Sequence, residues 1–157
     1  MKQLGFLVNN LSASQLSYYL LKGLNKWAED PNNDPTIYVM QVERPIIVPK
    51  LSIMNLAEVA GMRGTAIATD IETAGVMLDC ATTTSRFLYI WDTEWLRGPQ
   101  RIYENHAKVI RNPRLKLLCR SIDHKIAVEN CFNVKVAGIV DDFNLEQLLE
   151  IIQNGQE

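Results

Sequence analysis

Six short apolar runs recur along the chain, and each is closed by polar or turn-forming residues. They lie at residues 4–8, 36–42, 65–69, 87–91, 115–119 and 134–140. Runs of this length with abrupt polar ends are typical of strands buried on both faces of a parallel sheet. The clearest is FLYIW at 87–91, which stops at Asp92, Thr93 and Glu94. We therefore take this strand as the anchor of the predicted sheet.

The segments after the first and third of these runs are predicted to be helices. Ser12 stands three residues before Gln15, which is the spacing of a capping box. Apolar residues then recur every three or four positions as far as Trp27, as on the buried face of a helix. Asp70 is placed to cap a second helix, predicted over 71–81.

Further helices are predicted in the second half of the chain. One covers residues 101–111, and another begins after Ser121, with Ile122 and Ile126 expected to face the core. A last helix begins after Asn144, where an apolar stripe resumes.

The alternation of apolar runs and helical segments indicates the fold class. Segment 46–61 is the exception, and the best prediction for it is a short helix over 52–60. Strands that alternate with helices predict a three-layer, Rossmann-like α/β fold. We expect a mostly parallel sheet of about six strands with helices on both faces, formed by residues 1–157 as a single domain.

Composition narrows the function classes. The net charge is −2 and the sequence pI is about 5.7, so nucleic acid is not an expected partner. The three cysteines show no CxxC spacing and indicate reduced thiols, which favours a cytoplasmic location. No apolar run approaches the roughly 20 residues of a membrane span, and no signal peptide is expected.

Polar residues that follow the predicted strands form the candidate site, because the carboxyl ends of parallel strands meet at one edge of the sheet. The alternative for the serines and for Asp70 is a role as helix caps alone. For Asp141 the alternative is a favourable interaction with a helix dipole. The candidate ligand-binding residues are Asn9, Asn10, Ser12, Asp70, Asp92, Glu94, Arg120, Ser121, His124 and Asp141.

Asp92 and Glu94 are candidates to hold a divalent cation that bridges to substrate phosphates. Their spacing resembles the Asp-x-Asp motif of metal-dependent glycosyltransferases. The alternative is a solvated loop, and no resident metal or cofactor is expected.

Arg120, Ser121 and His124 are candidates for an anion site. A guanidinium and an imidazole at a helix N-terminus suit a phosphate or a carboxylate. The alternative for His124 is an ordinary surface histidine. His106 lies on an apolar helix face and is predicted to be structural. Trp95 is predicted to lie in a loop, where it could stack on a sugar or a base or pack against a second copy in a homodimer.

Several nucleotide and hydrolase motifs are missing from the sequence. It contains no GxGxxG, no GxxxxGK[ST] and no GxSxG. The usual dinucleotide site, the P-loop and the nucleophile elbow are therefore not expected.

The order of elements resembles one Rossmann-like domain of the GT-B glycosyltransferases. The likeness lies in residues 115–149, LKLLCRSIDHKIAVENCFNVKVAGIVDDFNLEQLL, and in residues 5–27. It implies a glycosyltransferase-like domain that binds a sugar nucleotide or a related phosphorylated ligand at the carboxyl edge. GT-B enzymes use a cleft between two such domains, and many retaining members carry two glutamates eight residues apart, which this sequence lacks. The alternative is a non-catalytic Rossmann-like interaction module.

Overall fold

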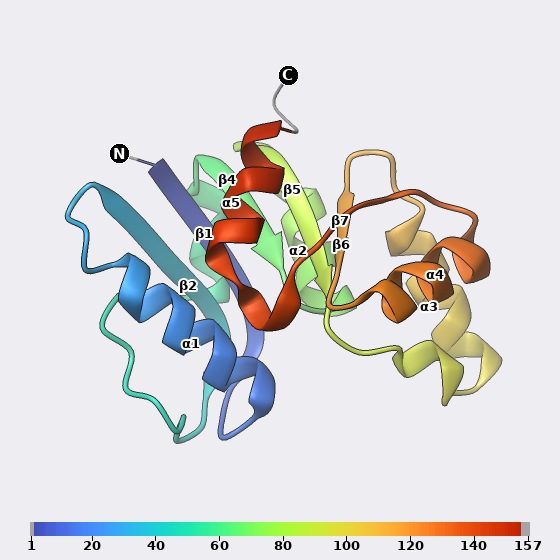
Figure 1. The fold of residues 1–157 in the computed structure, drawn as a ribbon, viewed down its shortest axis with the longest axis horizontal. Helices are drawn as coiled ribbons and strands as arrows, with labels where there is room; N and C mark the ends of the chain where they lie inside the picture. Colours follow the sequence, from blue (N-terminus) through green and yellow to red (C-terminus); the bar gives the residue numbers. More distant parts are fainter. Residues whose placement is uncertain (1, 155–157) are drawn as a thin grey trace.

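Seven parallel strands form one sheet in the order β3-β2-β1-β4-β5-β6-β7 in the computed structural model, which describes residues 2–154 (Figure 1). All six strand pairings are parallel. The predicted three-layer α/β class is confirmed, with one strand more than expected. The strands are β1 (Lys2–Leu11), β2 (Asn33–Val42), β3 (Ser52–Asn55), β4 (Gly64–Ala68), β5 (Thr83–Ile90), β6 (Lys116–Cys119) and β7 (Val136–Ile139).

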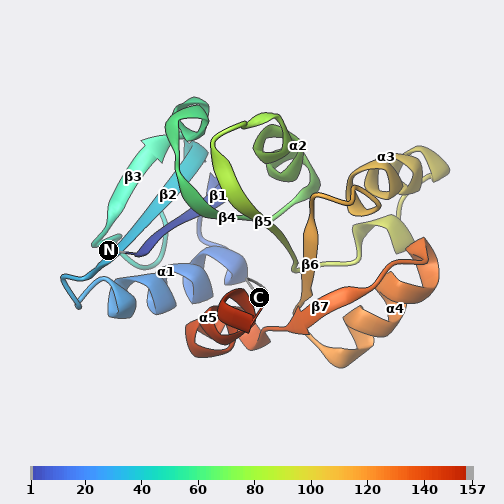
Figure 2. The same cartoon turned by 90° about the horizontal axis from the view of Figure 1, so that it is seen from above.

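Among the described residues, five α-helices and three short 3-10 helices lie between the strands or follow the last one. The α-helices are α1 (Gln15–Trp27), α2 (Ile71–Asp79), α3 (Gln100–Ile110), α4 (Ile122–Phe132) and α5 (Leu145–Asn154). The 3-10 helices are η1 (Leu56–Gly61), η2 (Glu94–Leu96) and η3 (Asp141–Phe143). Helices α1 and α5 pack on one face of the sheet, and α2, α3 and α4 pack on the other (Figure 2).

The anchor strand β5 contributes to the apolar core on both faces of the sheet. Leu88 and Ile90 belong to the cluster under α2, α3 and α4, whereas Phe87 and Tyr89 belong to the cluster under α1 and α5. All four are at most 5% exposed. Side chains of a strand alternate between faces, so a strand covered on both sides is apolar at every position. This confirms the prediction for the run.

The prediction of a helix over 52–60 is wrong in its first half. Residues 52–55 form strand β3, which pairs with β2 at the edge of the sheet, and η1 follows. All four residues of β3 are exposed, so the strand lacks the apolar signature of the others. Asn55 and Glu58 form a capping box that begins the 3-10 helix.

The cap of α1 is Ser14 rather than Ser12. Strand β1 continues to Leu11 because it remains paired with β2 as far as Val42. The helix therefore begins later, where the Ser17 N–H donates to Ser14 Oγ. The Ser12 N–H donates instead to the hydroxyl of Ser17.

The predicted inward face of α4 is also wrong. Ile122 and Ile126 are 55% and 51% exposed, while Val128 and Phe132 are buried. The helix lies beside α3, where the Phe132 ring stacks on Tyr103 with 5.2 Å between centroids. Contacts with β6, β7 and α3 cover the stripe that carries Val128 and Phe132, and helical spacing alone did not distinguish this stripe from the other.

The three cysteines lie in or beside the apolar core. Cys80 and Cys119 are buried, Cys131 is partly buried, and all three are free. Burial raises the pKa of the Cys119 thiol to about 12. Within residues 2–154, no helix has the length and apolar character needed to cross a membrane.

Candidate functional site

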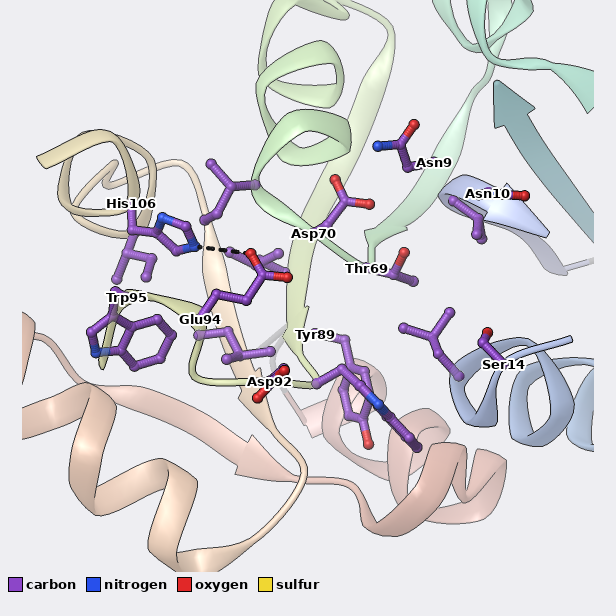
Figure 3. Close-up of a pocket in the computed structure, with 17 residues that line it drawn as sticks. Asn9, Asn10, Ser14, Thr69, Asp70, Tyr89, Asp92, Glu94, Trp95 and His106 are labelled. Atoms are coloured by element: carbon purple, nitrogen blue, oxygen red, sulfur yellow. Dashed lines mark ion pairs between the residues drawn. The ribbon is translucent and has the colours of Figure 1, made fainter. Parts of the chain in front are cut away.

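A pocket of about 240 Å³ lies at the carboxyl ends of β1, β4 and β5 (Figure 3). From β1 the chain proceeds to β2 on one side, and β4 lies on the other side of β1. The pocket therefore lies where the strand order reverses, which is the usual ligand position in open α/β sheets.

Polar groups from three strand ends and from α3 converge on this pocket over an apolar floor that includes Val8, Leu88 and Ile90. Five of the ten predicted residues line it: Asn9, Asn10, Asp70, Asp92 and Glu94. Ser14, Thr69 and His106 also line it and were not among the predicted ligand-binding residues.

The end of β1 supplies two amide side chains to the pocket, those of Asn9 and Asn10. Asn9 donates from Nδ2 to Glu72 Oε2 at 2.7 Å, which holds its side chain against α2. Asn10 Oδ1 is buried and has no hydrogen-bond partner among the described residues. A buried acceptor without a partner is costly.

The turn from β4 into α2 is tightly hydrogen-bonded. The Thr69 hydroxyl donates to the Leu7 carbonyl oxygen at 2.9 Å. The Thr73 N–H donates to Asp70 Oδ1 at 2.8 Å, so the predicted cap is confirmed. Asp70 therefore has both roles: it caps α2 and it lines the pocket. The two are compatible because a helix N-terminus at this edge faces the ligand position.

The end of β5 supplies two carboxylates. Asp92 forms an ion pair with Arg97 at 2.6 Å, and its Oδ1 accepts the Thr93 N–H. Glu94 Oε2 lies 3.9 Å from His106 Nε2. In the part of the chain that the structure describes, no group of three or more His, Cys, Asp or Glu side chains is placed to hold a metal ion.

The ring of His106 has a defined orientation. Its Nδ1 lies 2.8 Å from the Ile102 carbonyl oxygen, which only accepts, so the proton lies on Nδ1 and Nε2 is left as an acceptor. The side chain is 12% exposed. His106 thus supports the core, as predicted, and also lines the pocket. Its position on α3 carried no sequence signal for a site, because only the packing of α3 against η2 and α2 brings it there.

Trp95 lies beside the carboxylate of Glu94, but in the short helix η2 rather than in an irregular loop, and it is buried. It is 5% exposed, with its ring centroid 5.0 Å from Phe132 and 5.7 Å from His106. Trp95 forms a wall of the pocket and is not available to pack against a second copy.

The remaining predicted residues lie apart from this pocket. Arg120, Ser121, His124 and Asp141 line a separate depression at the ends of β6 and β7, together with Asp142. Ser12 lines a third depression, with Glu43 and Arg44. The edge of the sheet is therefore divided, and the ten residues do not form one site.

Ser121 caps α4 as predicted, since it accepts the His124 N–H at 3.2 Å. The Arg120 guanidinium is engaged within the protein. It pairs with Asp142 at 2.8 Å and lies 3.9 Å above the centre of the Trp91 ring. Asp142 has a φ of 43°, a left-handed conformation that favours glycine. Arg120 thus connects the loop after β7 to Trp91, which lines the main pocket.

Tyr89 closes the inner wall of the pocket. Its hydroxyl donates to the Val140 carbonyl oxygen at 2.6 Å, and its ring packs on Phe143 with centroids 4.3 Å apart. Burial raises the pKa of the Tyr89 hydroxyl, which stays protonated as a donor. This wall is rigid because both the ring and the hydroxyl are held.

Comparison of the chain with protein-family models, with curated proteins and with solved structures found no match in any of the three.

Proposed function

We propose that this protein is a glycosyltransferase-like domain that binds a sugar nucleotide or a related phosphorylated small molecule at the carboxyl edge of its sheet. The observation that carries the proposal is the pocket at the reversal of strand order, where amide, carboxylate, hydroxyl and imidazole groups converge. Such a combination of an apolar floor and a few convergent polar groups is typical of small-molecule sites.

The chemistry of the lining is consistent with a sugar-bearing ligand. Carboxylates such as Asp92 and Glu94 accept hydrogen bonds from hydroxyl groups, and the Nε2 lone pair of His106 can accept one more. The resemblance of residues 115–149 to a GT-B domain adds to this reading. A second domain or a partner subunit would complete the cleft that such enzymes use.

A thermal-shift screen with nucleotides and sugar nucleotides tests the proposal. A ligand present at 100 times its dissociation constant should stabilise the fold by about 2.7 kcal/mol. We expect at least one sugar nucleotide to raise the melting temperature, with the matching free base giving no shift. A screen in which no sugar nucleotide raises the melting temperature would contradict the proposal.

The alternative, a protein-interaction module, is favoured by one surface feature. Six exposed apolar side chains lie on β2, on the loop after it and on β3, which is an edge strand. They are Met40, Val42, Ile46, Val48, Ile53 and Met54, which are 37–76% exposed. Apolar clusters beside an unpaired strand edge are common at protein interfaces.

If this surface associates with a second copy, light scattering at micromolar concentration should report a homodimer. Val48, which is 76% exposed, gives the sharpest variant. Val48→Lys should return the mass to that of one chain, because a charge at an apolar interface must be desolvated. A wild-type mass near 17.8 kDa would contradict the homodimer.

A further inference from the structure

The main pocket continues into a second depression between α2 and α3. The two share Asn9, Asp70, Glu94 and His106, and the second adds Glu72 and Asn105. Their volumes are about 240 and 440 Å³. They form one continuous groove at the carboxyl edge, which we call the acidic groove.

The charges along the acidic groove have one sign. Four carboxylates line it, those of Asp70, Glu72, Asp92 and Glu94. Among the described residues that line it, there is no lysine or arginine. Within the described part of the chain, the one guanidinium bonded to any of these carboxylates is that of Arg97, which lies 2.6 Å from Asp92 and is 70% exposed.

We propose that the acidic groove binds the uncharged, polyhydroxylated part of the ligand and excludes its phosphates. This inference rests on the proposed function and names the part of the ligand that enters the pocket. A phosphate inside the groove would face several carboxylates without a cation to balance its charge. A hydroxyl group instead donates to a carboxylate and accepts from an amide, and both kinds of group line the groove.

The apolar walls fit the same ligand class. Tyr89, Trp91 and Trp95 line the pocket and give it aromatic, apolar walls. The 240 Å³ of the main pocket is less than the 300–1,000 Å³ typical of sites for drug-sized ligands, so it suits a single ring. The adjoining depression has room for a second hydroxylated unit.

A cationic ligand fits less well. A cation needs acceptors only, whereas the groove also presents the amides of Asn9, Asn10 and Asn105. One of the carboxylates already faces a cation of the protein, since Asp92 pairs with Arg97. An amine is therefore a competing outcome for the test rather than part of the proposal.

The three tryptophans provide a direct measurement. Trp91 and Trp95 line the pocket, whereas Trp27 lies in a separate depression beside α1 and α5, so it is an internal control. Indole ¹⁵N–¹H signals would be recorded while neutral monosaccharides, uridine, UDP-glucose, pyrophosphate and putrescine are each added at millimolar concentration. We expect a neutral probe and UDP-glucose to shift the signals of Trp91 and Trp95, and pyrophosphate and putrescine to leave them unchanged.

A matched pair of substitutions tests the carboxylate. Glu94→Gln should weaken binding of the neutral probe about tenfold or more, the range for loss of a hydrogen bond to a charged group. Pyrophosphate should still leave the Trp91 and Trp95 signals unchanged in this variant, because Asp70, Glu72 and Asp92 remain in the groove. Glu104→Gln is the control, since Glu104 is exposed on α3, bonds to Gln100 and does not line the groove. Equal affinities in wild type and Glu94→Gln would remove Glu94 from the site.

The outcomes separate this inference from the proposed function. Competition between UDP-glucose and pyrophosphate or putrescine at Trp91 and Trp95 would overturn the inference and leave sugar-nucleotide binding in place. If neutral probes shift these signals but no sugar nucleotide does, the inference that the groove binds polyhydroxylated groups stands. The proposed function, binding of a phosphorylated ligand, is then overturned. No shift at Trp91 or Trp95 with any probe would overturn both.

Discussion

Ile90→Asp is expected to prevent the protein from folding to a soluble native state. Ile90 is 5% exposed on strand β5 and lies in the core beneath α2, α3 and α4. An aspartate there would place an unpaired charge in an apolar cluster, and a buried charge without a partner costs several kcal/mol. That cost is comparable with the whole stability of a typical domain, about 5–15 kcal/mol. Leu88 lies two residues earlier on the same face of β5 and is also buried, so Leu88→Asp should have the same effect.

Ile122→Asp is the matched control. Ile122 is 55% exposed in the first turn of α4, where a carboxylate interacts favourably with the helix dipole. This variant should melt cooperatively near the wild-type temperature, measured by circular dichroism. A soluble Ile90→Asp protein with a cooperative melt would contradict the assignment of β5 to the core.

Arg120→Ala is expected to lower the free energy of unfolding by about 1–3 kcal/mol. The side chain is 30% exposed and makes both the ion pair with Asp142 and the contact with the Trp91 ring. Its loss leaves Asp142 without its cation in a loop whose backbone is already in a left-handed conformation. For a chain of this length each kcal/mol corresponds to about 2–4 °C in melting temperature.

Arg97→Ala provides the comparison for this effect. Arg97 also pairs with an aspartate, Asp92, but it is 70% exposed. Exposed ion pairs contribute about 0–1 kcal/mol, so this variant should melt close to wild type. Equal melting temperatures for the Arg120→Ala and Arg97→Ala proteins would show that the Arg120 contacts do not stabilise the loop.

Much of the fold followed from local patterns. The six apolar runs became strands because burial on both faces leaves an uninterrupted apolar signature, as in β5. Asp70 and Ser121 cap helices because their side-chain oxygens accept the N–H groups of the first turn, a purely local contact. Strand β3 was missed because all of its residues are exposed, so its sequence shows neither the alternating nor the continuous apolar pattern of a buried strand. Only its pairing with β2 defines it.

The candidate site was predictable in part. The rule that parallel strands end at one edge was sufficient to select Asn9, Asp70 and Glu94. Asn9 and Asp70 lie at the ends of β1 and β4, which border the reversal of strand order, and Glu94 follows the neighbouring strand β5. The same rule also selected Arg120, which ends a strand farther along the sheet and lies in a separate depression. Distance across the sheet separates the two groups, and that distance depends on the order of strands.

By itself, then, the sequence determined the alternation of strands and helices, the buried strand at 87–91 and the polar residues at strand ends. These depend on contacts within a few residues and on the burial that each position requires. The tertiary structure alone decided the strand order, the buried stripe of α4, the burial of Trp95 and the placement of His106 beside Glu94. Those features arise from contacts between segments far apart in the chain, whose energies depend on packing geometry that no local pattern encodes.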